Sequence, residues 1–122
     1  METGADVRIS YAHFEEVDEV LTLTLAEGPG EEGTMIHFMR ALWEDDDDVH
    51  QVDNGRHDSV DGAVRSWALA GHVLTVNFHE VAAAQLRYPE TTVWELDLDE
   101  PAVDEVHDHL REIMVDVPET AT

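Results

Sequence analysis

Apolar and polar residues alternate with a period of two along much of the N-terminal half, which predicts β-strands. The alternation covers residues 7–12 and returns where Leu21, Leu23 and Leu25 are separated by threonines. The strand that contains Leu21, Leu23 and Leu25 is expected to have one buried and one solvated face. After a Gly/Pro-rich loop at 27–33 comes a run over 35–39 that is apolar on both faces, so we place its strand in the centre of the sheet.

Two hairpins are predicted in the middle of the chain. Asp53-Asn54-Gly55 is a turn signal, and Asn-Gly favours a type I′ turn, so a weak hairpin is expected from 49–52 into 56–60. A second hairpin pairs 63–69 with 72–78 around Ala70-Gly71. A further strand is expected over 92–98. Its inward residues are Trp94, Leu96 and Leu98.

The pattern changes to a helical period in two places. An alanine-rich helix is expected near 80–87, ending before Pro89. A C-terminal helix is expected at about 100–114, because Asp99 is a good N-cap and Pro101 falls in the first turn. Its apolar stripe follows the 3.6-residue repeat. The stripe consists of Val103, Val106, Leu110, Ile113 and Met114.

These elements predict an α+β fold with no βαβ alternation. We expect a mostly antiparallel sheet of five to seven strands, with the short helix near 80–87 and the C-terminal helix packed on one face. The length of 122 residues favours a single domain over 1–122, with 1–6 and 116–122 frayed.

The charge of the chain is unusual for a small domain. Six arginines and no lysines stand against 29 acids, which gives a formal net charge of −23. All but four of the acids lie between Val7 and Val115, so the acidity belongs to the folded surface. A field of this sign repels nucleic acids and anionic membranes and attracts basic proteins.

Two explanations of the charge remain open at this point. The field serves the binding of a basic partner, or it is an adaptation to a cytoplasm salty enough to screen it. No run approaches the roughly 20 apolar residues of a spanning helix, and the N-terminus lacks a basic region followed by an apolar one. We therefore expect a cytoplasmic protein, while its oligomeric state is left undetermined.

Catalytic and cofactor chemistry finds little support. There is no cysteine, no nucleophile elbow, no glycine-rich phosphate loop and no lysine. Of the eight histidines, His107 and His109 are two apart and point about 200° away from each other on a helix, so they cannot chelate one ion. We predict no cofactor, no metal site and no enzyme, with a small metal-dependent enzyme as the less favoured alternative.

Two acidic segments are the candidate partner-binding residues. A large aromatic beside an acidic run can grip a basic protein, since the acids steer the encounter and the ring supplies desolvated contact. The alternative is that Trp43 ends a core strand and the acids form a solvated loop. The predicted set is Trp43, Glu44, Asp45, Asp46, Asp47, Asp48 and His50, together with Glu15, Glu16, Asp18 and Glu19.

Several features between Met35 and Met114 resemble the Immunity protein 10 family of bacterial polymorphic-toxin systems. They are an apolar strand running into an arginine at 35–42, an acidic, glutamine-containing loop at 45–51, and the stretches 74–76 and 82–86. The final helix, with Leu110 and Ile113, completes the resemblance. The resemblance implies a cytoplasmic antidote that binds a cognate toxin and blocks it, and it implies no catalytic residues.

The sequence thus predicts an immunity-type inhibitor that neutralises a basic protein toxin by electrostatic steering and occlusion. Its partner is expected to be a basic protein such as a toxin domain, not a nucleic acid or a membrane. The alternative function is that of a salt-adapted acidic cytoplasmic protein of unrelated activity.

Overall fold

Nine strands and two helices make up the part of the chain that the computed structural model describes, residues 7–27, 35–41, 50–55, 58–115 and 117–119. The strands of the first half are β1 (Val7–Ile9), β2 (Tyr11–Val17), β3 (Val20–Ala26), β4 (Met35–Ala41), β5 (Gln51–Asp53) and β6 (Ser59–Asp61). The second half contains β7 (Val64–Ala70), β8 (Val73–Phe78), α1 (Glu80–Leu86), β9 (Thr91–Leu96) and α2 (Glu100–Ile113). The predicted α+β class is confirmed.

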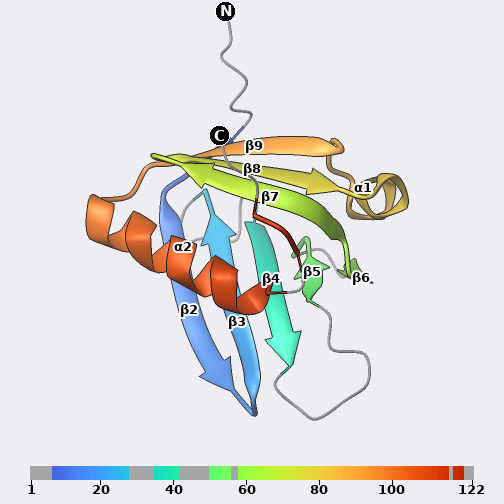
Figure 1. Ribbon diagram of the computed structural model, residues 1–122, viewed down its shortest axis with the longest axis horizontal. Coiled ribbons are helices and arrows are strands. Elements are labelled where there is room, and N and C mark those ends of the chain that lie inside the picture. Colours follow the sequence, from blue (N-terminus) through green and yellow to red (C-terminus); the bar gives the residue numbers. More distant parts are fainter. Residues whose placement is uncertain (1–6, 28–34, 42–49, 56–57, 116, 120–122) are drawn as a thin grey trace, which may run out of the picture.

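The strands form two sheets. The five-stranded sheet has the order β2-β3-β4-β5-β6 and is antiparallel throughout, so β4 is its central strand, as its two apolar faces predicted. The four-stranded sheet has the order β1-β9-β8-β7, in which only the β1–β9 pair is parallel. In Figure 1 the four-stranded sheet lies at the top and the five-stranded sheet extends below it.

Division into two sheets is where the architecture differs from the single sheet expected. Residues 7–12 read as one continuous strand, but the chain leaves the four-stranded sheet after Ile9 and enters the five-stranded sheet at Tyr11. Ser10 marks the change of partner, because its N–H bonds to the carbonyl of Ala26 in β3. The alternation shifts by one residue at this corner, because Ile9 is buried before it whereas Ala12 and Phe14 pack against the core after it.

The core fills the space between the two sheets and α2. Helix α2 crosses one face of β2, β3 and β4, as Figure 1 shows. Four of the five predicted stripe residues lie within α2, and all four are buried. The fifth, Met114, follows the helix and is also buried. The largest fully buried side chains are Trp67, Trp94, Phe38 and Phe78, and they come from both sheets.

Both predicted hairpins are present, and their connecting turns differ in length. In the β7–β8 hairpin, Gly71 adopts φ 60° in a two-residue connection. In the β5–β6 hairpin the connection runs from Asn54 to Asp58, longer than the predicted type I′ turn. Asp53 accounts for the difference, since its carboxylate accepts the Gly55 N–H and the Ser59 hydroxyl and so closes a wider loop.

Helix α2 begins as predicted. Asp99 is its N-cap and accepts the Ala102 N–H at 3.1 Å, with proline in the first turn. Helix α1 ends at Arg87, which adopts the left-handed conformation.

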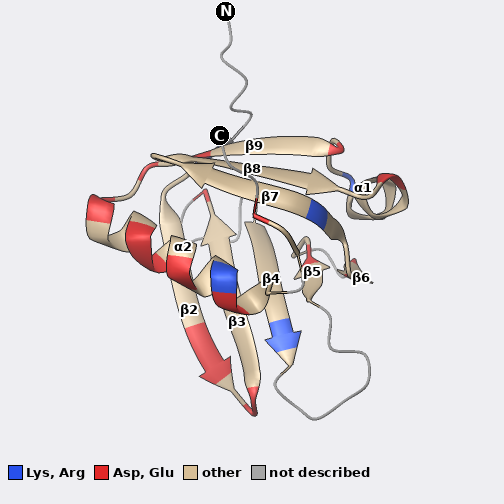
Figure 2. Cartoon of the chain, in the orientation of Figure 1, with Lys and Arg blue, Asp and Glu red and all other residues tan. Residues whose placement is uncertain are grey.

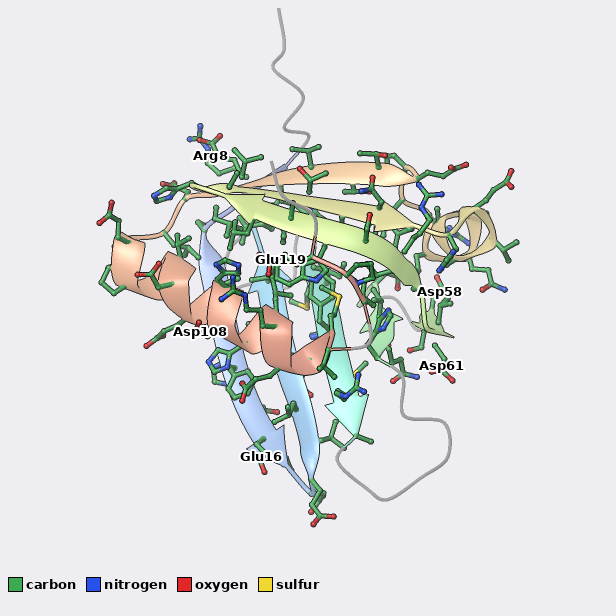
Figure 3. The ribbon with its side chains drawn as sticks, in the orientation of Figure 1. Arg8, Glu16, Asp58, Asp61, Asp108 and Glu119 are labelled. Carbon is green, nitrogen blue, oxygen red and sulfur yellow. The ribbon has the colours of Figure 1, made fainter. Side chains whose placement is uncertain are left out.

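The C-terminal segment differs from the frayed tail that was expected. Val117 is buried, and the carbonyl of Pro118 accepts the Trp67 N–H of the edge strand β7. Glu119 accepts hydrogen bonds from His107 Nε2 at 2.6 Å and Arg111 Nε at 2.9 Å. Segment 117–119 therefore packs between β7 and α2, where Figure 3 places Glu119.

Candidate partner-binding surface

Four of the predicted partner-binding residues lie at the far end of the β2–β3 hairpin. Asp18 and Glu19 form its two-residue turn and both have positive φ, 53° and 63°. Glu15 pairs with Thr22, whereas Glu16 pairs with Leu21. Since neighbouring residues of a strand point to opposite faces, Glu15 projects on the face away from α2 and Glu16 on the face that α2 crosses. Figure 3 shows Glu16 near the lower end of β2.

The other predicted segment, Trp43, Glu44 and Asp45 to Asp48, lies outside the described residues. Its position in the chain is between β4 and β5, which are neighbours in the five-stranded sheet. Ala41, the last residue of β4, pairs with Val20, the first residue after the β2–β3 turn. The two acidic segments are thus attached to the same end of the five-stranded sheet.

His50 has a different position from the one predicted for it. Its side chain is only 1% exposed, and Nε2 accepts the Val64 N–H at 2.9 Å. The imidazole links β5 to the start of β7 across the two sheets. A buried ring with a backbone hydrogen bond cannot contact a surface partner, so His50 is a structural residue of the fold.

One whole face of the five-stranded sheet is free of α2, and we call it the open face. Its residues follow from the strand registers, because paired residues point to the same side. One row across the strands is His13, Thr24, His37, Asp53 and Ser59, and the next is Glu15, Thr22, Met39, Gln51 and Asp61. No helix in the described part of the chain crosses these rows.

A concavity lies at the centre of the open face. It is lined by Thr22, His37, Met39, Asp53 and Gly55 and has a volume of about 350 Å³. His37 is held in place by a 2.7 Å hydrogen bond between its Nδ1 and the Thr24 hydroxyl. The lining thus combines an apolar thioether, a ring and a carboxylate in one shallow site.

Acids and arginines are distributed unevenly over the described surface, as Figure 2 shows. The described arginines are Arg8, Arg40, Arg65, Arg87 and Arg111. None of them belongs to the rows of the open face. Acids line the exposed side of α2, at Asp104, Glu105, Asp108 and Glu112.

Histidines on α2 contact different neighbours. His107 bonds to Glu119, while His109 stacks on Phe14 of β2 with ring centroids 3.5 Å apart. The Arg111 guanidinium, followed by His107, lowers the pKa of the Glu119 carboxyl below its usual value of 4.5. These contacts tie the C-terminal segment to α2.

No group of three or more histidine, aspartate or glutamate side chains that could hold a metal ion occurs within the described ranges. Among the helices described, none is long and apolar enough to cross a membrane.

Comparison with protein families gives a match that covers most of the fold. The model of the family "Immunity protein 10" matches residues 8–104, from β1 into the first turns of α2. The chain belongs to the Immunity protein 10 family. No curated protein and no solved structure matched the chain. The family match begins earlier than the resemblance noted from the sequence, since it includes β1, β2 and β3.

Family membership suggests an immunity protein of toxin systems, a binding protein in place of an enzyme. For an Immunity protein 10 member, the open face and the acidic end of the five-stranded sheet are the surfaces of interest. The sequence indicated the acidic end directly. It also contained a signal for the open face, because Met35, His37 and Met39 alternate with buried residues on β4. An apolar second face on a central strand equally predicts burial, so this signal alone does not predict the concavity.

Proposed function

We propose that the chain is an immunity-type inhibitor that binds a cognate, basic protein toxin and blocks it by occlusion. The observation that carries the proposal is the family match over residues 8–104. Immunity proteins of toxin systems act by binding a toxin, and the described residues offer no grouping suited to metal chemistry.

The basic character of the toxin is supported by the charge of the chain. With 29 acids and six arginines, the formal net charge is −23. A field of this size raises the rate at which a positively charged protein is encountered, and it disfavours acidic partners. Electrostatic steering is therefore the first step of the proposed mechanism, and steric occlusion of the toxin by the bound inhibitor is the second.

We assign steering to the acidic end of the five-stranded sheet. Glu15, Glu16, Asp18 and Glu19 lie at the β2–β3 turn and are all exposed. The acids 44–48 continue from β4 at the same end. In the proposal Trp43 supplies an aromatic anchor within this acidic environment, since aromatic residues dominate the energetics of interfaces.

Co-expression tests the proposal. A candidate toxin, chosen as a neighbouring gene whose product stops growth when it is expressed alone, is expressed in a host cell with and without the chain. We expect the toxin alone to stop growth, co-expression to restore it, and the two proteins to elute as one complex in gel filtration. Growth arrest in both strains, with separate elution of the two purified proteins, would overturn the proposed function.

A further inference from the structure

We infer that the open face of the five-stranded sheet is the surface that contacts the toxin, with the central concavity receiving a lysine or arginine side chain. The inference rests on the proposed function and names the surface that performs it. The partner on the open face is a basic protein, and one of its lysine or arginine side chains enters the concavity.

Shape is the first argument. Two neighbouring rows of side chains are left uncovered on β3, β4 and β5, and the centre of this surface is hollowed to about 350 Å³. Thr22, His37, Met39 and Asp53 are all partly exposed, so they can be reached from solvent. Interface hot spots are typically long side chains that fill such a recess and lose their water there.

Charge complementarity is the second argument. Within the described rows of the open face the charged carboxylates are Glu15, Asp53 and Asp61, and none of the arginines that the structure describes belongs to these rows. Asp53 accepts hydrogen bonds from the Gly55 N–H and the Ser59 hydroxyl, which fix its carboxylate beside the concavity. A carboxylate oxygen has two lone pairs, so each of the two Asp53 oxygens can still accept a hydrogen bond from an incoming cation.

The lining chemistry suits the stem of a basic side chain as well as its head. Lysine and arginine carry apolar methylene stems that pack along hydrophobic surface while the charge stays near polar groups. Met39 offers an adaptable apolar wall. Asp53 lies on the neighbouring strand β5, two residues along from the residue that pairs with Met39. One residue of the partner can therefore contact both.

The outer face of the four-stranded sheet provides an internal comparison. Its polar groups bond to one another, with Thr91 donating to Asn77 at 2.8 Å and Asn77 donating to Ser66 at 3.0 Å. It also carries Arg8, paired with Glu95 at 3.6 Å. Polar groups on the open face are hydrogen-bonded as well, so the difference between the two faces lies in the cation. Arg8 lies on the outer face of the four-stranded sheet, whereas none of the described arginines belongs to the rows of the open face.

A matched pair of substitutions tests the inference. Thr22→Arg places a cation in the concavity, whereas Thr75→Arg places it at a partly exposed threonine on the outer face of the four-stranded sheet. The probe is the toxin identified by the co-expression test, and its Kd for each variant is measured by calorimetry. We expect T22R to weaken binding by about tenfold or more, as for a hot-spot residue, and T75R to change it by less than about twofold.

A second pair guards against misfolding of T22R, with thermal melting measured for each variant. Glu15→Arg, at an exposed open-face position, is compared with Glu90→Arg, an exposed position that precedes β9. The two variants change the net charge equally. We expect E15R to lower the association rate by about threefold more than E90R, because its charge lies within the contact.

The outcomes separate the inference from the proposed function. A wild-type chain that does not bind the toxin overturns the proposed function, and the inference falls with it. A wild-type chain that binds, with folded T22R and E15R no weaker than T75R and E90R, overturns the inference and leaves the inhibitor function standing. Selective weakening by the open-face variants supports both.

Discussion

Arg40 of β4 donates a hydrogen bond from Nη1 to the carbonyl oxygen of Ile113, the last residue of α2, at 2.9 Å. Arg40 as a residue is 5% exposed, so the contact is made inside the protein. The C-terminus of a helix carries partial negative charge and unbonded carbonyls. Arg40 therefore satisfies one of these carbonyls and fixes the end of α2 on the central strand of the five-stranded sheet.

Replacing Arg40 is expected to destabilise the fold. Arg40→Met keeps much of the apolar stem but leaves the Ile113 carbonyl without this donor, which costs about 2–3 kcal/mol for a bond to a charged group. Urea denaturation measures the free energy of unfolding. Arg65→Met is the control, because Arg65 is exposed on β7 and the same change there is expected to cost no more than about 0.5 kcal/mol. Equal losses in the two variants contradict the role given to Arg40.

The β2–β3 turn is expected to gain stability from glycine. Glu19 has φ 63°, a conformation that costs an ordinary residue roughly 1–2 kcal/mol and glycine almost nothing. Glu19→Gly should therefore raise the free energy of unfolding by about 0.5–1 kcal/mol after the greater chain entropy of glycine is subtracted. Thermal and urea unfolding measure the change.

A control for this turn comes from the neighbouring strand. Glu16→Gly removes the same charge from an extended position in β2, where glycine weakens a strand. The two variants are thus expected to shift stability in opposite directions. If both are stabilised alike, loss of charge repulsion explains the gain and the backbone conformation of Glu19 does not.

Acid is expected to weaken the attachment of the C-terminal segment. The pKa of Glu119 is lowered, chiefly by the hydrogen bond from Arg111 and then by that from His107. A lowered folded-state pKa means that the ionised carboxylate stabilises the fold above the ordinary value of 4.5, and that this contribution is lost as the pH falls through the folded-state pKa. The contribution is at most about 1 kcal/mol, because the partners are partly exposed.

Glu119→Gln measures that contribution. The difference in unfolding free energy between wild type and E119Q is expected to be largest at neutral pH and to shrink below pH 4.5. In an Arg111→Met background the same difference should be smaller at every pH, since the main cause of the lowered pKa has been removed. A difference independent of both pH and Arg111 would show that Glu119 acts by some other means.

Much of the fold followed from pattern alone. The 3.6-residue stripe and the Asp99 cap located α2 to within a residue or so of its observed ends. The period-two runs located β3, β4, β7, β8 and β9. The division into two sheets did not follow. Apolar residues alternate without a break across Ser10 in the sequence, whereas in the structure the chain changes partner there and the core-facing positions shift from Ile9 to Ala12 and Phe14.

The candidate site was less predictable than the fold. The acidic residues near the β2–β3 turn were proposed as binding residues because charge is visible in the sequence, and that role stays a prediction. His50 was misplaced, since its neighbours in sequence are acids while its neighbours in space are the backbone of β7 and the core. The open face was not predicted, because the row Met35, His37 and Met39 on a strand is as compatible with burial under a second layer as with the partial exposure that the structure shows.

Salt is expected to slow binding of the toxin without abolishing it. With a net charge of −23, encounter with a basic protein is accelerated by long-range attraction, and the Debye length shrinks from about 10 Å at 0.1 M salt to about 3 Å at 1 M. The association rate, measured by stopped-flow fluorescence, should therefore fall steeply over this range, by about tenfold or more. The dissociation rate should change much less, since it depends on short-range contacts. An association rate that is flat across the range contradicts steering.

The same salt series on the free chain separates steering from salt adaptation. If the acidity serves a partner, the fold must tolerate its own repulsion in dilute buffer, and the chain is expected to melt cooperatively there. Added potassium chloride should then raise the melting temperature only modestly, by screening repulsion among exposed acids such as those on α2. A chain that folds only at about 1 M salt or above would instead show that the charge is matched to a saline cytoplasm, because its self-repulsion would then be tolerated only where the Debye length has fallen to about 3 Å.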